Sequence, residues 1–215
     1  MSERMLMVAL LFVLTFVWGC KPAQTDPPKP PPPPPPPAGA NLGNMPERTT
    51  RFAFDLFSKL QGELPDENLF VSPLSVAMAL SIVYHGAGAD TASAIAKAMG
   101  WDGLDAGQVG AALKGLAAQL QAADPEVKLT IADSLWARDD VTFKPTFLEA
   151  VKATPDVRVE ALNFGDPASA GIINNWVKDK TAGLIPEITT PQDLAGLWLM
   201  VLDAVYFKGR WSDVF

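Results

Sequence analysis

Two kinds of hydrophobic pattern alternate along the chain after residue 46. Nonpolar residues spaced three or four positions apart predict helices, whereas alternating or short continuous nonpolar runs predict strands. We expect helices at 46–62, 73–84, 91–99, 105–123, 144–154 and 167–183. The same criteria predict strands at 68–71, 127–136, 157–162 and 198–207. The order mixes single helices, helix pairs and strands, which indicates an α+β domain.

The predicted helix at 73–84 has no charged residue and no polar face. Ser72 is a favourable N-cap and Pro73 suits the first helical position, so the helix is expected to begin there. A helix that is apolar on all sides is surrounded by protein, which would bury Ser75 and Ser81 and require hydrogen-bond partners for them. We expect Gly86 to cap its C-terminus, and Asp90 to cap the next helix.

The segment 198–207 is almost continuously apolar, as expected of a strand covered on both faces in the middle of a large sheet. A fully buried helix and such a strand both need extensive surrounding structure. Roughly 170 residues follow the proline-rich segment described below, and no internal repeat supplies further layers. The elements therefore predict about half of a larger domain.

Composition excludes several classes of function. The chain has 215 residues with 17 Lys and Arg against 24 Asp and Glu, a formal charge of −7 that argues against nucleic-acid binding. One cysteine and one histidine leave no disulfide framework and no cysteine- or histidine-based metal cluster, so we expect no cofactor. No nucleophile motif accompanies His85, which we interpret as a residue at a helix C-terminus. The chain is predicted not to be an enzyme.

The N-terminus has the features of a targeting segment. Arg4 precedes an apolar run, 5–18, that is too short to cross a bilayer comfortably and fits the core of a secretory signal. The run ends in Val17-Trp18-Gly19-Cys20, which resembles a bacterial lipobox. We expect Cys20 to be acylated and to become the mature N-terminus; the alternative is an uncleaved anchor helix with an incidental cysteine.

A proline-rich stretch follows Cys20. The run 30–37 is continuous proline, which adopts an extended polyproline II conformation and predicts a stiff tether. A ligand for a proline-binding module is the alternative. We therefore expect a signal peptide at 1–20, a tether at 21–45 and a folded domain at 46–215. The protein would be extracytoplasmic, lipid-anchored to the cell envelope or surface, and otherwise secreted.

Three blocks of the folded part resemble the serpin family. The first is Asn68-Leu69-Phe70-Val71-Ser72-Pro73-Leu74-Ser75 with Thr91, and it is similar to the region of the family's buried second helix. The second contains Asn174, Trp176, Thr181 and Gly183 and resembles the helix that crosses the large sheet. The third, 204–211, resembles the strand beneath that helix. The blocks occur in the family's order but cover only about the N-terminal half of a serpin.

The resemblance implies a fold of helices packed around a large, mostly antiparallel sheet, present here only in part. Serpins trap serine or cysteine proteases when a cleaved reactive loop inserts into that sheet as an extra strand. The reactive loop lies near the C-terminus of serpins, so the reactive-site bond is absent from this chain. The implied partners are a target protease and, through the N-terminal lipid, a membrane; we expect a monomer.

The resemblance also assigns structural roles, none of them catalytic. It places Ser72, Pro73, Ser75 and Asp203 in the shutter, where the sheet opens, and Trp211 at the breach above it. For Trp176, Trp198 and Tyr206 we expect ordinary packing. The alternatives to protease trapping are a non-inhibitory binding or structural lipoprotein, an inactive truncated serpin and, last, a tethered hydrolase.

Two strand residues depart from the family pattern. Asp133 and Asp203 stand where the family usually has asparagine, and an ionised carboxylate can only accept hydrogen bonds. The family usually places a histidine near the second position, on a strand outside this chain. We therefore hypothesise a pair between Asp203 and that histidine that makes sheet opening sensitive to pH.

Overall fold

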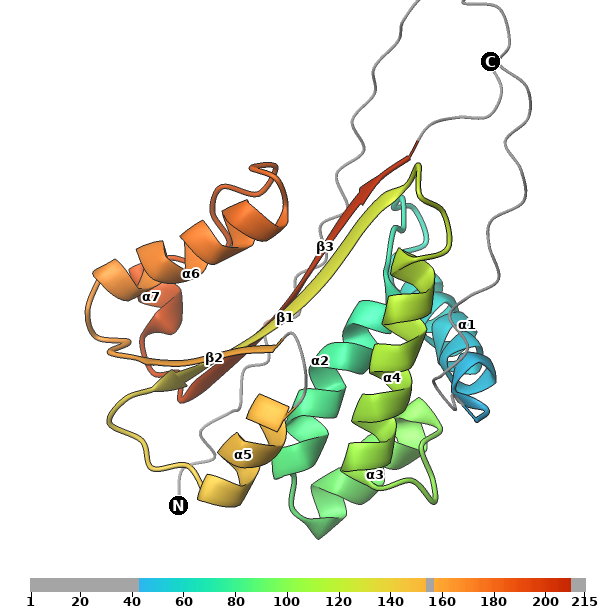
Figure 1. Ribbon diagram of the computed structural model, residues 1–215, viewed down its shortest axis with the longest axis horizontal. Helices are drawn as coiled ribbons and strands as arrows, with labels where there is room; N and C mark the ends of the chain where they lie inside the picture. The colour runs from blue at the N-terminus through green and yellow to red at the C-terminus, as the bar shows by residue number, and fades with distance from the viewer. Residues whose placement is uncertain (1–42, 154–156, 210–215) are drawn as a thin grey trace, which may run out of the picture.

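The computed structural model describes residues 43–153 and 157–209 (Figure 1). These residues form seven helices and three strands in mixed order. The helices are α1 (Met45–Glu63), α2 (Pro73–Gly86), α3 (Ala89–Met99), α4 (Ala106–Gln121), α5 (Pro145–Ala153), α6 (Ala168–Lys180) and the short α7 (Pro191–Leu194). The strands are β1 (Lys128–Arg138), β2 (Val157–Leu162) and β3 (Leu199–Lys208). The α+β class expected from the sequence is confirmed.

The three described strands form one mixed sheet in the order β2-β1-β3. The central strand β1 runs parallel to β2 and antiparallel to β3, with Asp133 opposite Asp203 in the antiparallel register. Within the described residues, β3 pairs only along the edge that faces β1. Its other edge therefore has backbone groups that another strand could pair with.

Helices cover both faces of this sheet (Figure 1). On one face lies α2, with α4 packed against it and α1 and α3 farther out. On the other face, α6 crosses the strands and α7 lies beside it. Separate apolar clusters fill the two interfaces. Ile173 and Trp176 of α6 pack with Trp136 of β1 on one face, and Ile82 of α2 packs with Leu135 and Val201 of the sheet on the other.

The apolar helix predicted at 73–84 is confirmed as α2. The Ser72 side chain accepts a hydrogen bond from the backbone N–H of Ser75, and Pro73 occupies the first turn. Ser75 is 3% exposed and Ser81 is 5% exposed, as expected for a helix enclosed by protein. The buried Ser81 hydroxyl donates to the carbonyl of Met78 at 2.7 Å, so it is satisfied within its own helix.

Some predicted details were wrong. Residues 68–71 form no strand, because no described segment lies alongside to pair with their backbone. Asp90 lies in the first turn of α3, whose N-cap is Gly88, and α2 ends at Gly86 with Ala87 as its C-cap. Trp198 is 52% exposed and precedes β3, so it does not pack in the core.

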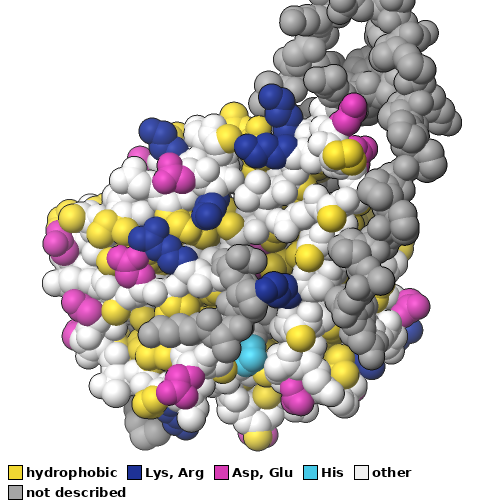
Figure 2. Space-filling model, viewed as in Figure 1, with side chains coloured by type: hydrophobic (Ala, Val, Ile, Leu, Met, Phe, Trp, Pro, Cys, Tyr) yellow, Lys and Arg dark blue, Asp and Glu magenta, His cyan; other side chains and the backbone are white. Residues whose placement is uncertain are grey.

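No helix among residues 43–153 and 157–209 is long and apolar enough to cross a membrane. On the face in Figure 2, basic and acidic side chains are interspersed rather than gathered by sign.

Candidate functional site

The N-terminus of α2 brings two serines together at the sheet. The hydroxyl oxygens of Ser72 and Ser75 lie 2.9 Å apart, within hydrogen-bond distance. Ser72 caps the helix, and Pro73 fixes the backbone of the first turn. This cap turns Ser75 inward, where its hydroxyl lies near the carboxyl of Asp203 on β3. The structure thus places the four residues predicted for the shutter in one region.

Asp203 and Asp133 form a second feature of this region, which we call the acidic pair. They are directly opposite in the antiparallel register of β3 and β1, so both side chains project from the same face. Asp133 is 5% exposed. Oδ1 of Asp133 and both carboxylate oxygens of Asp203 are shielded from solvent and make no hydrogen bond of ordinary geometry with described residues.

Burial dominates the electrostatics of the acidic pair. Removal from water, followed by the neighbouring charge of Asp203, raises the pKa of Asp133 well above its ordinary value. Burial likewise raises the pKa of Asp203 to about 6, although the Ser75 hydroxyl acts in the opposite direction. A carboxyl with such a pKa changes charge near neutral pH, which is unusual for aspartate.

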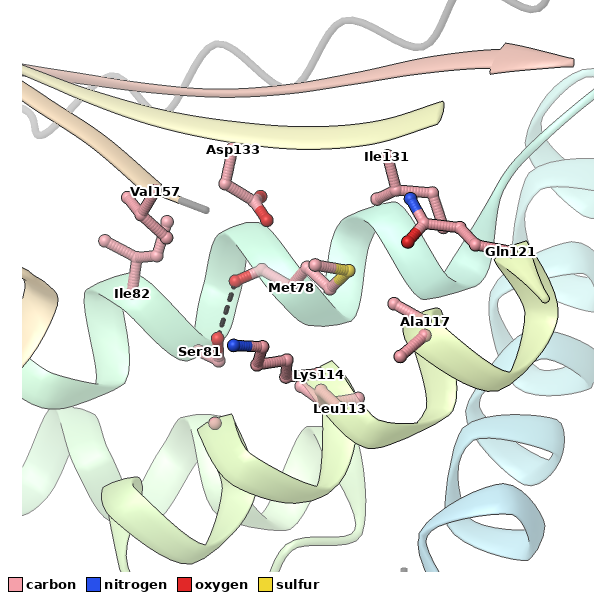
Figure 3. A pocket seen from close by; sticks show the side chains of 12 residues that line it. Met78, Ser81, Ile82, Leu113, Lys114, Ala117, Gln121, Ile131, Asp133 and Val157 are labelled. Carbon is pink, nitrogen blue, oxygen red and sulfur yellow. Dashed lines mark hydrogen bonds between the residues drawn. The ribbon is translucent and has the colours of Figure 1, made fainter. Parts of the chain in front are cut away.

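A small cavity borders Asp133 between β1, α2 and α4 (Figure 3). Its volume is about 50 Å³, enough for water, and its polar lining includes Ser81, Lys114 and Gln121. In Figure 3, Lys114 extends from α4 toward Ser81, while Asp133 projects into the same space from β1. Among the described residues, no ion pair joins Lys114 to Asp133.

On the opposite face of the sheet, Asn174 ties α6 to the segment before α7. Its side-chain amide donates to the carbonyl of Thr189 at 2.8 Å. Its Oδ1 accepts from the backbone N–H groups of Ile188 and Thr189 at 2.9 and 3.1 Å. The Asn174 side chain therefore fixes the backbone at Ile188 and Thr189 next to α6.

An aromatic contact holds the same helix on the sheet. The rings of Trp136 on β1 and Trp176 on α6 meet edge to face, with centroids 6.0 Å apart. Trp136 is fully buried and its indole N–H donates to the Ser134 hydroxyl at 2.8 Å. The packing expected for Trp176, which is 5% exposed, is confirmed, as is that of Tyr206 at 9%.

Two further predicted residues end α6. The Thr181 hydroxyl donates to the carbonyl of Val177 at 2.8 Å and accepts from the N–H of Ile185 at 3.1 Å. Gly183 has a φ of +82°, a left-handed conformation that glycine adopts readily, and its N–H bonds the carbonyl of Lys178. These contacts stop the helix three residues before the end predicted from the pattern.

The remaining predicted residues are not part of either cluster. Asn68 and Thr91 are exposed, and Cys20 and Trp211 lie outside the described residues. In the described part of the chain, the neighbour of Asp203 is Asp133, and the pairing of Asp203 with a histidine on a strand outside this chain stays a prediction. The sole histidine of this chain, His85, lies at the far end of α2 beside Gly110. No three histidine, cysteine or acidic residues within the described ranges are arranged to bind a metal ion.

Sequence reasoning missed two components of the site. It identified Asp133 and Asp203 separately as departures from a pattern, but not as partners across β1 and β3. It also missed Trp136, whose only signal was a large aromatic residue in a predicted strand.

Comparisons with known proteins agree with this architecture. The family model described as "Serpin (serine protease inhibitor)" matches residues 47–215. Leukocyte elastase inhibitor from Bos taurus is 32% identical over 169 residues, covering 77% of this chain and 44% of that protein. Neuroserpin from Mus musculus is 30% identical, covering 79% and 42%. The crystal structure of uncleaved ovalbumin is similar with a TM-score of 0.66 and 29% identity, covering 76% and 45%. The chain thus spans less than half the length of these relatives.

Proposed function

Because this chain belongs to the serpin family, we propose that it is the N-terminal part of a protein that traps a serine or cysteine protease by inserting a cleaved loop into its sheet. The observation that carries the proposal is the outer edge of β3, which is unpaired within the described residues. An extended segment can add to such an edge through main-chain hydrogen bonds. The family that matches residues 47–215 is a family of serine protease inhibitors rather than of enzymes.

The contacts around β3 suggest how insertion would be controlled. The acidic pair and Ser75 lie on one face of the β1–β3 pair, while the Trp136–Trp176 contact holds α6 on the other and Asn174 ties α6 to the segment before α7. A strand entering beside β3 would have to displace or slide past α6. In this proposal, the shutter residues Ser72, Pro73, Ser75 and Asp203 control separation of the strands, and Trp211 lies at the breach.

The trapping proposal predicts a covalent product. The protein purified from its natural source would be incubated with a panel of serine and cysteine proteases and analysed by denaturing gel electrophoresis. We expect an adduct of inhibitor plus protease that survives denaturation, because the trapped protease remains bound as an acyl-enzyme. Cleavage of the protein by every protease tested, without any adduct, would contradict trapping.

Similarity to ovalbumin supports a second candidate function. Ovalbumin does not carry the name of an inhibitor. Its structure resembles this chain about as closely as the structure of protease nexin-1 does, with TM-scores of 0.66 and 0.68. A non-inhibitory binding or structural role at the cell surface would give cleavage without an adduct in the same experiment. The presence or absence of the covalent adduct on the gel therefore distinguishes the two candidate functions.

We also propose that the folded domain, 46–215, is displayed on a membrane of a bacterial cell by a lipid on Cys20 and a proline-rich tether at 21–45, after cleavage directly before Cys20 has removed the preceding residues of the predicted signal segment (1–20). The sequence around Cys20 and the proline run support this arrangement. A monomer held in this way could meet proteases outside the cytoplasm without diffusing away.

The anchor predicts a change in location. Replacing Cys20 with alanine removes the thiol that the lipid would modify, so we expect the protein to move almost completely from the membrane fraction to the soluble fraction. Fractionation followed by immunoblotting measures the distribution. The matched control, Pro33→Ala, alters the tether but keeps the thiol and should stay with the membrane. Membrane retention of the Cys20→Ala protein would show that another element anchors it.

A further inference from the structure

The acidic pair lies in surroundings that do not neutralise two negative charges. Asp133 and Asp203 face each other across β1 and β3, and three of their four oxygens are buried without a hydrogen bond. Two ionised carboxylates only accept hydrogen bonds and repel each other. With one proton, however, one carboxyl can donate to the other, and the two strands gain a bond in place of a repulsion.

Four elements near the acidic pair, α2, α4, β2 and α5, could supply charged groups to it. The helix above the pair, α2, has no charged residue before His85 at its far end. From α4, Lys114 lines the cavity next to Asp133 but extends toward Ser81. Beside Asp133, β2 contributes Val157, while the guanidinium of Arg158 lies over the Trp136 ring on the opposite face. On α5, Glu149 is exposed.

We propose that Asp133 and Asp203 share a single proton, and that this proton acts as a pH-sensitive clamp between strands β1 and β3. At mildly acidic pH the clamp is closed. As the pH rises, the proton leaves, the two carboxylates repel each other beneath α2, and the strands separate more easily. The inference stands on the register, burial and surroundings of the pair and does not depend on protease inhibition.

The direction of the pH dependence follows from proton binding. A carboxyl whose pKa is raised by folding holds its proton in the folded protein after the unfolded chain has lost it. The resulting stability is complete below the ordinary pKa of 3.8 and is lost as the pH rises through the folded value, about 6 for Asp203. Over that interval the folding equilibrium constant should fall on the order of 100-fold from the raised pKa of Asp203 alone.

Titration of His85 would change the stability with pH in the opposite direction, so His85 is replaced in the protein used for the measurement. Burial lowers the pKa of His85 below its ordinary value of 6.5, although Asp105 partly opposes this effect. The unfolded chain therefore binds a proton there that the folded protein does not, so stability from His85 rises with pH. The His85→Gln substitution removes this opposing contribution, so the effect of the acidic pair can be measured without it.

The test is denaturant unfolding of the full chain in the His85→Gln background between pH 4 and pH 8. We expect the parent to lose stability as the pH rises. Asp203→Asn should make that loss clearly smaller and be more stable than the parent above pH 7, because the neighbouring negative charge is gone and an amide can donate to Asp133 at any pH. The control is Asp139→Asn, an exposed residue just beyond β1 that should leave the curve unchanged. Equal pH dependence in the parent and Asp203→Asn would overturn the proposal.

A second measurement covers the case in which Asp203→Asn does not fold. Carbon-13 NMR of the aspartate carboxyl groups in the His85→Gln protein should show that Asp133 and Asp203 titrate together, with one step near pH 6 or above. Titration of both groups below pH 5 would overturn the clamp.

Added Ca²⁺ or Mg²⁺ provides a further test at pH 7.5. If either cation stabilised the parent but not Asp203→Asn, a cation rather than a proton would neutralise the pair, and the clamp would be overturned.

The lysine at the cavity provides another discriminating variant. If Lys114 neutralised Asp133, the parent would keep its stability above pH 7 and Lys114→Gln would lose it. If the shared proton neutralises the pair, Lys114→Gln should retain the falling stability of the parent. The first pattern would contradict the clamp, and the second would support it.

Discussion

Replacing Trp136 with alanine should reduce the free energy of unfolding by about 3–5 kcal/mol, the range for truncating a large aromatic residue in a core. Trp136 is fully buried on β1, and its ring contacts Trp176 edge to face. The substitution would leave a cavity between α6 and the sheet and would free the hydroxyl of Ser134 from its partner. A loss of this size is a large share of the stability of a typical domain.

Denaturant unfolding followed by far-ultraviolet circular dichroism measures this loss without relying on tryptophan fluorescence. The chain offers a matched control in Trp198→Ala, because Trp198 is 52% exposed and precedes β3. We expect the control to change stability by less than about 1 kcal/mol. Equal losses for the two variants would mean that the α6 interface contributes little to stability.

Replacing Asn174 with alanine should cost about 2–4 kcal/mol, because it removes three hydrogen bonds at once. The backbone N–H groups of Ile188 and Thr189 and the carbonyl of Thr189 would each lose their partner. Thr189 is only 3% exposed, so water has limited access to restore these bonds. We also expect the segment before α7 to become more sensitive to proteolysis.

Asn175 provides the control for this substitution, since it is the next residue on α6 and is exposed. Unfolding of Asn175→Ala should differ from the parent by less than about 0.5 kcal/mol. Asn174→Asp separates the contributions further, because aspartate keeps the two acceptor bonds and loses the donor to Thr189. A stability for Asn174→Ala equal to that of Asn175→Ala would contradict the role assigned to this side chain.

The sequence correctly predicted the helices and strands that are determined by residues close together in the chain. Ser72 followed by Pro73 and an uncharged apolar run identified α2, and Asp105 was correctly expected to begin α4, where it forms a capping box with Gln108. The apolar run before residue 208 identified β3. Each of these signals depends on residues within one or two turns or within one strand.

Features that depend on long-range register could not be predicted in this way. Nothing near Asp133 in the sequence indicates that it lies opposite Asp203, because that pairing is set by how two distant strands align. The segment 68–71 has the composition of a strand, yet pairing requires a neighbour that the described residues do not supply. Trp198 is a residue type that usually packs in the core, yet it is exposed here.

The central claim, that β3 borders the place where a cleaved loop inserts, is tested most directly by hydrogen–deuterium exchange. Exchange of the β3 amides would be compared in the natural protein before and after a single cleavage by a protease. The N–H groups of β3 that do not bond β1 should exchange readily before cleavage and become protected afterwards, as a new strand pairs with them. Unchanged exchange in β3 after complete cleavage would contradict insertion at this edge.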